Sequence, residues 1–163
     1  MAGVVSNEHE LIISLSDMIT FPSGEAALDS RVVPILEYVS QLAETKPQLL
    51  IENAGHTGDR PVAAAAFPSN WELSTARASR VARALLDLSG IDPVRISTRG
   101  YAYHRPLYKN DSDEHRAANR RVEVRFFHPL AAPSIVRETT QAATVPFHRN
   151  LALNDKKHRP LSQ

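Results

Sequence analysis

Segments with strand-like and helix-like periodicity alternate along the first 128 residues of this 163-residue chain, and their order constrains the fold more than any other feature. Apolar residues that alternate indicate strands, and apolar residues spaced by three and four indicate helices. The predicted order is strand, helix, strand, helix, strand, strand. We therefore expect an α/β fold of the α+β sandwich type, with two main helices on one face of a mixed four-stranded sheet. The predicted strands are 11–16, 49–53, 94–101 and 122–126, and the predicted helices are 29–44, 70–88 and a short one around 113–118.

The second helix has the clearest local signal in the chain. Ser69 and Glu72 form a capping box, in which the serine hydroxyl caps the helix and the glutamate reaches back to its start. Gly90 suits the C-terminal end of this helix. In the first helix, Pro34 would kink an interior position, so we expect the helix to begin near Asp29, with the proline in or beside the first turn.

Composition excludes several classes of protein. The hydrophobic fraction of 42% is enough for a real core. The net charge of +1 argues against a general nucleic-acid binder, although the first 57 residues are acidic and the remainder is basic. The absence of cysteine excludes disulfides, thiolate metal sites and a thiol nucleophile. The seven histidines show no zinc-ligand spacing, so we expect neither a metal nor a cofactor.

The two ends of the chain carry different information. No apolar run approaches the roughly 18–20 residues that span a bilayer, and the N-terminus lacks the pattern of a signal peptide. We therefore expect either a cytosolic protein or a fragment of one that is anchored elsewhere. Residues 129–163 contain four prolines and no glycine, which favours an extension that is at best partly ordered. We expect residues 1–128 to form the domain.

A candidate binding site follows from the second helix. Asn70 and Arg77 are seven residues apart and share one face, with Ser74 between them. A helix N-terminus favours an anion, and the planar arginine fork matches a carboxylate. Thr57 and Asp59 follow the second predicted strand in a turn just upstream. Asp59 either binds the ammonium group of a zwitterionic ligand held by Arg77 or forms an ion pair with Arg77 and no ligand.

Four segments in register resemble the OmpA-like peptidoglycan-binding domain. Residues 70–81 fit the pattern N-x-x-L-S-x-x-R-A-x-x-V of that family. Residues 21–24 resemble the loop after its first strand, and Gly55-His56-Thr57 resembles the start of its G-H-T-D turn. Gly100-Tyr101, Pro106 and Asn119-Arg120-Arg121-Val122-Glu123 resemble its C-terminal motifs. The resemblance covers about residues 8–128, and residues 67–74 are especially similar to the MotB branch, the wall-anchoring subunits of flagellar stators.

This resemblance implies a non-catalytic periplasmic domain of a protein anchored in the inner membrane. The implied ligand is the stem peptide of peptidoglycan, held at the zwitterionic end of diaminopimelate. The implied partners are a second copy in a homodimer and an inner-membrane channel subunit of the stator, with no nucleic acid. The family's ligand arginine falls on Arg77. The other implied site residues are Phe21, Thr57, Asp59, Asn70, Leu73, Ser74 and Arg120.

One departure from the family pattern leaves a second function open. Gly58 stands where the family turn has its aspartate, and the next residue, Asp59, substitutes only if the turn aims it at the ligand. The alternative is a scaffold or dimerisation module of an envelope machine that has lost peptidoglycan binding. A hydrolase using His56 and Asp59 near Ser74 is a third hypothesis, but sequence adjacency does not supply the required geometry.

The aromatic residues near this site receive a structural interpretation. We expect Trp71 to pack beside the start of its helix rather than serve as a ligand platform. We expect Tyr101, Tyr103 and Tyr108 to pack within their loop rather than contact sugar or peptide.

Overall fold

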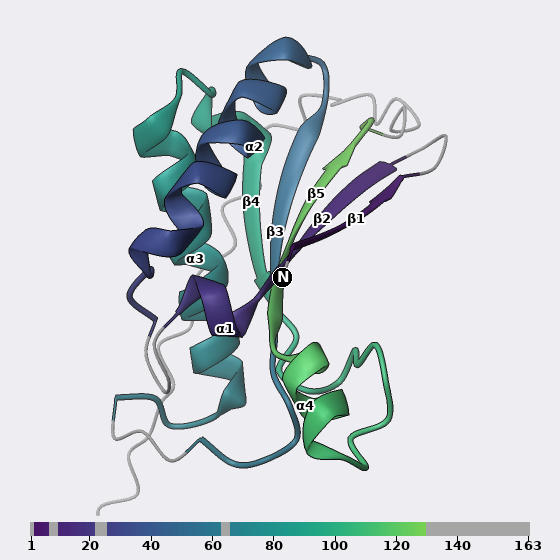
Figure 1. Ribbon diagram of the computed structural model, residues 1–163. Coiled ribbons are helices and arrows are strands. Elements are labelled where there is room, and N and C mark those ends of the chain that lie inside the picture. The colour runs from purple at the N-terminus through teal and green to yellow at the C-terminus, as the bar shows by residue number, and fades with distance from the viewer. Residues whose placement is uncertain (1, 7–9, 22–25, 63–65, 130–163) are drawn as a thin grey trace, which may run out of the picture. The chain divides into compact units, whose positions relative to one another are not determined.

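The computed structural model describes residues 2–6, 10–21, 26–62 and 66–129, which lie within one compact unit, Met1–Leu130 (Figure 1). The predicted extension beyond residue 129 lies outside the described residues. None of the described helices has the length and hydrophobicity needed to cross a membrane. The strands are β1 (Ala2–Ser6), β2 (Glu10–Ser16), β3 (Leu50–His56), β4 (Ile96–Gly100) and β5 (Arg121–Phe127). The α-helices are α1 (Asp17–Thr20), α2 (Val33–Thr45), α3 (Asn70–Leu88) and α4 (Asp113–Asn119).

The strands form one mixed sheet in the order β1-β2-β5-β3-β4. Only β3 and β4 are parallel among the paired strands, and the other pairs are antiparallel. Helices α2 and α3 cover one face of this sheet (Figure 1). The core between the two layers is apolar and includes Ile13, Leu15, Leu36, Val39, Ile51, Val81, Leu85, Val124 and Phe126. The expected α/β architecture is confirmed.

The expected number of strands was one too few. The missed strand, β1, pairs antiparallel with β2 at the edge of the sheet, and all five of its residues are exposed. An edge strand with no buried face need not alternate apolar and polar residues, so Val4 and Val5 are adjacent and both exposed. Periodicity therefore gave no signal for β1, whereas the ladder with β2 forms through backbone groups.

The local helix signals correspond closely to the structure. The Ser69 hydroxyl accepts a hydrogen bond from the Trp71 N–H at 3.1 Å and donates one to the Glu72 carboxylate, as a capping box predicts. A short 3-10 turn over Ser30–Val32 precedes α2, and the Asp29 side chain accepts a hydrogen bond from the Arg31 N–H. Pro34 consequently falls in the first turn of α2, where its missing N–H costs little.

Two glycines let α3 approach the sheet closely. A Cβ atom on Gly55 would lie 2.0 Å from the Ser74 carbonyl oxygen, and one on Gly100 would lie 2.2 Å from the Thr75 hydroxyl oxygen. Any side chain at either position would therefore displace the helix from the ends of β3 and β4. This contact fixes the first two turns of α3, which carry four of the eight predicted site residues.

Candidate functional site

Two arginines, one from α3 and one from the position between α4 and β5, converge on a single carboxylate, Asp17, at the start of α1. The Arg77 Nη1 atom lies 2.6 Å from Asp17 Oδ1, and the Arg120 Nε atom lies 3.6 Å from Asp17 Oδ2. The Arg77 guanidinium also lies over the Phe21 ring, 4.9 Å from its centroid. Three predicted site residues, Phe21, Arg77 and Arg120, are thus brought together by an acid that the sequence analysis did not identify.

The ion pair at the centre of this cluster is buried. The Arg77 side chain is 4% exposed and the Asp17 side chain 13%, whereas Arg120 is 38% exposed at the rim. Burial raises the pKa of the Asp17 carboxyl and lowers the pKa of the Arg77 guanidinium, although each group favours the charged form of the other. Desolvation therefore outweighs the attraction within the pair. Of these three charged groups two are cationic and one is anionic, so together they carry one surplus positive charge.

Four other predicted site residues are uncharged and hold α3 and the neighbouring loops in place. The Ser74 hydroxyl accepts a hydrogen bond from the Ala102 N–H at 3.1 Å, and the Thr57 N–H donates to the Ala102 carbonyl at 2.8 Å. The Asn70 amide donates to the carbonyl of Arg60 at 3.0 Å, which ties the turn after β3 to the start of α3. Leu73 is buried in the same part of the helix. These contacts fix α3 against two loops.

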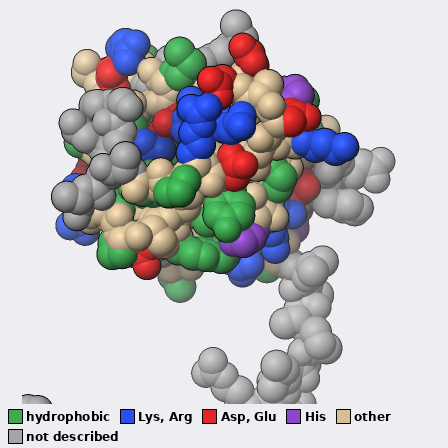
Figure 2. Space-filling model, turned by 90° about the horizontal axis from the view of Figure 1, so that it is seen from below, with side chains coloured by type: hydrophobic (Ala, Val, Ile, Leu, Met, Phe, Trp, Pro, Cys, Tyr) green, Lys and Arg blue, Asp and Glu red, His purple; other side chains and the backbone are tan. Residues whose placement is uncertain are grey.

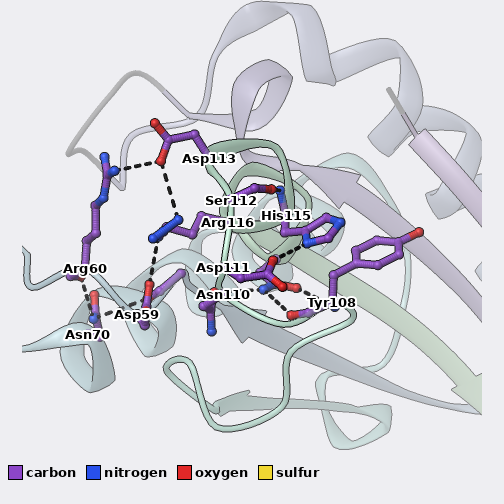
Figure 3. A network of polar contacts seen from close by, with 12 residues as sticks. Asp59, Arg60, Asn70, Tyr108, Asn110, Asp111, Ser112, Asp113, His115 and Arg116 are labelled. Atoms are coloured by element: carbon purple, nitrogen blue, oxygen red, sulfur yellow. Dashed lines mark hydrogen bonds and ion pairs between the residues drawn. The ribbon is translucent and has the colours of Figure 1, made fainter.

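The remaining predicted residue, Asp59, belongs to a separate network at the surface (Figure 3). Its carboxylate accepts a hydrogen bond from Arg116 Nε at 3.1 Å, and Arg116 lies 3.5 Å from Asp113, which also pairs with Arg60 at 2.6 Å. A Cβ atom on Gly58 would lie 3.3 Å from the Arg116 Cβ, so the glycine gives α4 room to approach the turn. Asp17 therefore takes the place beside Arg77 that the spacing had suggested for Asp59.

A weak signal for Asp17 was present in the sequence. It directly follows the first predicted strand and lies four residues before Phe21, which is the first residue of the segment that resembles the family loop. Its partner Arg77 is 60 positions away, and the backbone N–H of Asp17 bonds to the Arg120 carbonyl at 3.0 Å. Only the folded arrangement of three distant segments identifies this contact.

The groups that a hydrolase would need do not come together. Along β3, Gly55 faces α3, so the next residue, His56, points to the opposite face of the sheet. There His56 lies 3.7 Å from Glu123 and stacks on Tyr101, beside a hollow of about 350 Å³. Ser74 and Asp59 lie elsewhere, in the contacts described above. The described residues contain no group of three side chains suited to hold a metal ion.

The opposite face of the sheet also carries a half-buried carboxylate, Glu123. It accepts a hydrogen bond from Arg121 Nε at 2.7 Å. Burial alone would raise the pKa of Glu123, but His56 and Arg121 together lower it to about 2. Unlike Asp17, this carboxylate has enough partners to offset its desolvation.

Comparison with known proteins relates the chain to the OmpA family and to a motility protein. The model of the OmpA family matches residues 20–120. Motility protein B of Bacillus subtilis is 36% identical over 114 residues, which are 70% of this chain and 44% of that protein. The chain thus spans less than half the length of this curated relative.

Two solved structures show the same fold at 26–31% sequence identity. The cell wall anchor of the T6SS from Pseudomonas aeruginosa superposes with a TM-score of 0.72 at 31% identity, covering 78% of this chain and 88% of that one. The periplasmic domain of Helicobacter pylori MotB (residues 78–256) also gives a TM-score of 0.72 at 26% identity, covering 80% and 83%. Because the family model matches more than half of the chain, this protein belongs to the OmpA family.

Proposed function

We propose that this domain binds the stem peptide of peptidoglycan without chemistry and anchors a MotB-like stator to the cell wall. The observation that carries the proposal is the cluster of Arg77 and Arg120 around Asp17, over the Phe21 ring. Family membership supports the same interpretation, because relatives include motility protein B and a solved cell wall anchor.

The charges of the cluster suit the zwitterionic end of diaminopimelate. The surplus positive charge of Arg77 and Arg120 attracts a carboxylate, and an arginine fork binds it in a bidentate manner. Asp17 accepts the ammonium group, in the role that the family turn gives to its aspartate. Burial costs the Asp17–Arg77 ion pair more than the attraction between its two charges returns. Each charged group of the ligand adds a further partner, so ligand binding favours the charged forms of Asp17 and Arg77. Asp59 has no part in this arrangement.

A binding assay with purified sacculi tests the proposal. Arg77→Lys keeps the charge but loses the planar fork, and we expect it to reduce co-sedimentation with diaminopimelate-type sacculi about tenfold. Arg116→Lys makes the same exchange in the surface network and serves as the matched control. Circular dichroism establishes that both variants fold. Equal binding by Arg77→Lys and the unchanged protein would exclude Arg77 from the site.

A scaffold or dimerisation role is the second candidate, and two contacts favour it. Asp59 is held by Arg116, and Arg77 is already paired with Asp17, as expected of a domain that has lost its ligand. In this case the unchanged chain would not co-sediment with sacculi at all. Both candidates are non-catalytic, so the pure domain should release no soluble fragments from sacculi.

The partners and location follow from the same resemblance. We place the domain in the periplasm as part of a protein anchored in the inner membrane, acting as a homodimer with a stator channel subunit. Two copies would raise the holding strength through avidity, which suits an anchor that resists load. Cross-linking of the full-length protein in its native cells would test this, because a stator role requires both the dimer and the channel subunit among the products.

A further inference from the structure

The hollow beside His56 lies on the face of the sheet opposite α2 and α3. Its volume of about 350 Å³ is within the range of cavities that hold small-molecule ligands. The polar side chains that line it include Glu52 and His56 of β3, Arg121 and Glu123 of β5, and Tyr101 and Arg105 of the loop after β4. This face therefore carries a charged cavity that is separate from the Arg77 cluster.

His56 presents an unused hydrogen-bond donor to the hollow. Its side chain is 3% exposed, and neither ring nitrogen has a hydrogen-bond partner among the described residues. The Nε2 atom lies 3.7 Å from Glu123 Oε2, which is too long for a hydrogen bond. An imidazole carries at least one N–H in either tautomer, and a buried N–H without an acceptor is costly. A ligand oxygen in the hollow would satisfy this group.

Arg121 supplies further unused donors. Its side chain is 5% exposed, and it donates to Glu123, to the Asn119 carbonyl and to the Arg105 carbonyl. These three hydrogen bonds leave two of the five guanidinium N–H groups without a partner among the described residues. The hollow is thus lined by buried donors from two neighbouring strands, which favours a ligand that accepts hydrogen bonds.

The charge of the hollow favours an anion. The other charged residues that line it, Glu52, Arg121, Glu123 and Arg125, each have an oppositely charged partner. Arg105 differs, because no carboxylate of the described residues lies within ion-pair distance of it. Its guanidinium lies over the Tyr101 ring, 3.9 Å from the ring centroid, and the same ring stacks on His56. One surplus positive charge is therefore held at the edge of the hollow.

Exposed charges elsewhere offer no comparable site. Basic and acidic side chains lie mixed together on the surface seen from below (Figure 2). Water solvates and screens such groups, as it does the exposed pair of Arg60 and Asp113. In the hollow, burial of His56 and Arg121 lowers the local dielectric constant, which strengthens their attraction for an anion.

The lining also restricts the kind of anion. Glu52 and Glu123 line the same hollow and would repel a dianion such as phosphate, whereas one negative charge matches the surplus at Arg105. A planar carboxylate accepts parallel hydrogen bonds from an arginine. Ile12 and Pro106 add apolar surface to the lining, which suits a ligand with an apolar body.

We propose that the hollow binds a small monocarboxylate with an aromatic or other apolar body. Arg105 and Arg121 attract the carboxylate, and the His56 N–H supplies a further donor. The site shares no side chain with the Arg77 cluster and lies on the other face of the sheet. It therefore goes beyond the proposed function and does not depend on it.

Benzoate is the probe for this site. The full chain is titrated with sodium benzoate at constant ionic strength, and the ring signals of His56 are followed by NMR after assignment through bonds to the backbone. We expect a saturable shift of the His56 signals with benzoate. Neutral benzyl alcohol and inorganic phosphate should give no saturable shift, because the first lacks the charge and the second carries too much of it.

Two variants of the same type test the role of Arg105. Arg105→Gln removes the surplus charge from an exposed position and should lower the affinity for benzoate about tenfold. Arg80→Gln is the matched control, because it removes the same charge from an exposed position on α3, in the layer of helices. Arg77→Lys, which tests the peptide site, should also leave the titration of His56 unchanged.

Three results would overturn the carboxylate site. They are the absence of a saturable benzoate shift, an equal response to benzyl alcohol or phosphate, and an equal loss of affinity in Arg80→Gln. None of them bears on sacculus binding, so this inference and the proposed function fail independently.

Discussion

Two ion pairs in this molecule consist of the same residue types, an arginine and an aspartate, but differ in how far they are buried. Arg77 and Asp17 are buried between α3 and α1, with side chains 4% and 13% exposed. Arg116 and Asp59 lie in a surface network, with side chains 19% and 42% exposed. The buried pair has a net desolvation cost, whereas the surface pair is solvated and screened. Burial therefore sets the electrostatic environment of the two pairs apart, and the proposed ligand site uses the buried one.

The largest effect should come from removing one partner of the buried pair. Arg77→Ala leaves the Asp17 charge buried without its main partner, and we expect a loss of about 3 kcal/mol in the free energy of unfolding at neutral pH. Arg116→Ala at the surface should cost less than about 1 kcal/mol. Urea denaturation measures both. The double variant Asp17→Asn with Arg77→Gln should recover part of the loss, and equal effects of the two alanine variants would refute the contrast.

The next effect concerns which acid belongs to the ligand site. Asp17→Asn removes the proposed acceptor for the ligand ammonium and should weaken sacculus binding about tenfold. Asp59→Asn should change binding less than about twofold, because Asp59 contacts Arg116 rather than the Arg77 cluster. Co-sedimentation of the two isosteric variants measures this difference. If Asp59→Asn proved the weaker binder, the acid of the site would be Asp59 after all.

The pH dependence of stability should separate Asp17 from Glu123. Burial raises the pKa of Asp17 above its ordinary 3.8, so the folded state binds this proton more tightly and stability falls as pH rises through that range. The pKa of Glu123 is lowered from 4.5 to about 2. Its contribution to the free energy of unfolding is therefore complete above pH 4.5 and is lost as the pH falls toward 2.

Variants without these carboxyls test both signs. Asp17→Asn should remove a decrease in the free energy of unfolding with rising pH, and Glu123→Gln should remove an increase. Urea denaturation at a series of pH values between about 2 and 7 measures both slopes. Relative to the unchanged protein, the two variants should change the slope of the free energy of unfolding against pH in opposite directions. Changes of the same sign would contradict the assignment.

The smallest effect should be the salt dependence of the surface network. At 1 M salt the Debye length falls to about 3 Å, so exposed pairs such as Arg60 and Asp113 lose most of their attraction. The cost of Asp113→Asn, expected to be below about 1 kcal/mol at low salt, should then approach zero. The cost of Arg77→Ala should persist, because a buried pair is screened much less.

Much of the fold could be predicted from local pattern. The capping box at Ser69 and Glu72 and the position of Pro34 both act through neighbouring residues, and the structure confirms both. The edge strand β1 was missed because none of its residues is buried, so it has no apolar period to detect.

The candidate site was predictable only in part. Arg77, Phe21 and Arg120 were named from a motif. The acid that pairs with both arginines, Asp17, is identified only when α1, α3 and the junction of α4 and β5 come together. Residue spacing along one helix carries no information on which distant acid will meet it. Trp71 packs beside the start of its helix as expected, but its partner ring, His104, lies 33 positions away in the chain, and no local pattern identifies that contact.

The sequence by itself determined the order of β2, α2, β3, α3, β4, α4 and β5, the ends of α3, and the arginine at the centre of the proposed site. These features follow from short-range sterics, capping and periodicity, which act within a few residues. The tertiary structure alone decided that Asp17 rather than Asp59 lies beside Arg77, and that Trp71 stacks on His104 at the surface. Charge pairing and burial depend on distances between segments far apart in the chain, and only packing of the helices on the sheet fixes those distances.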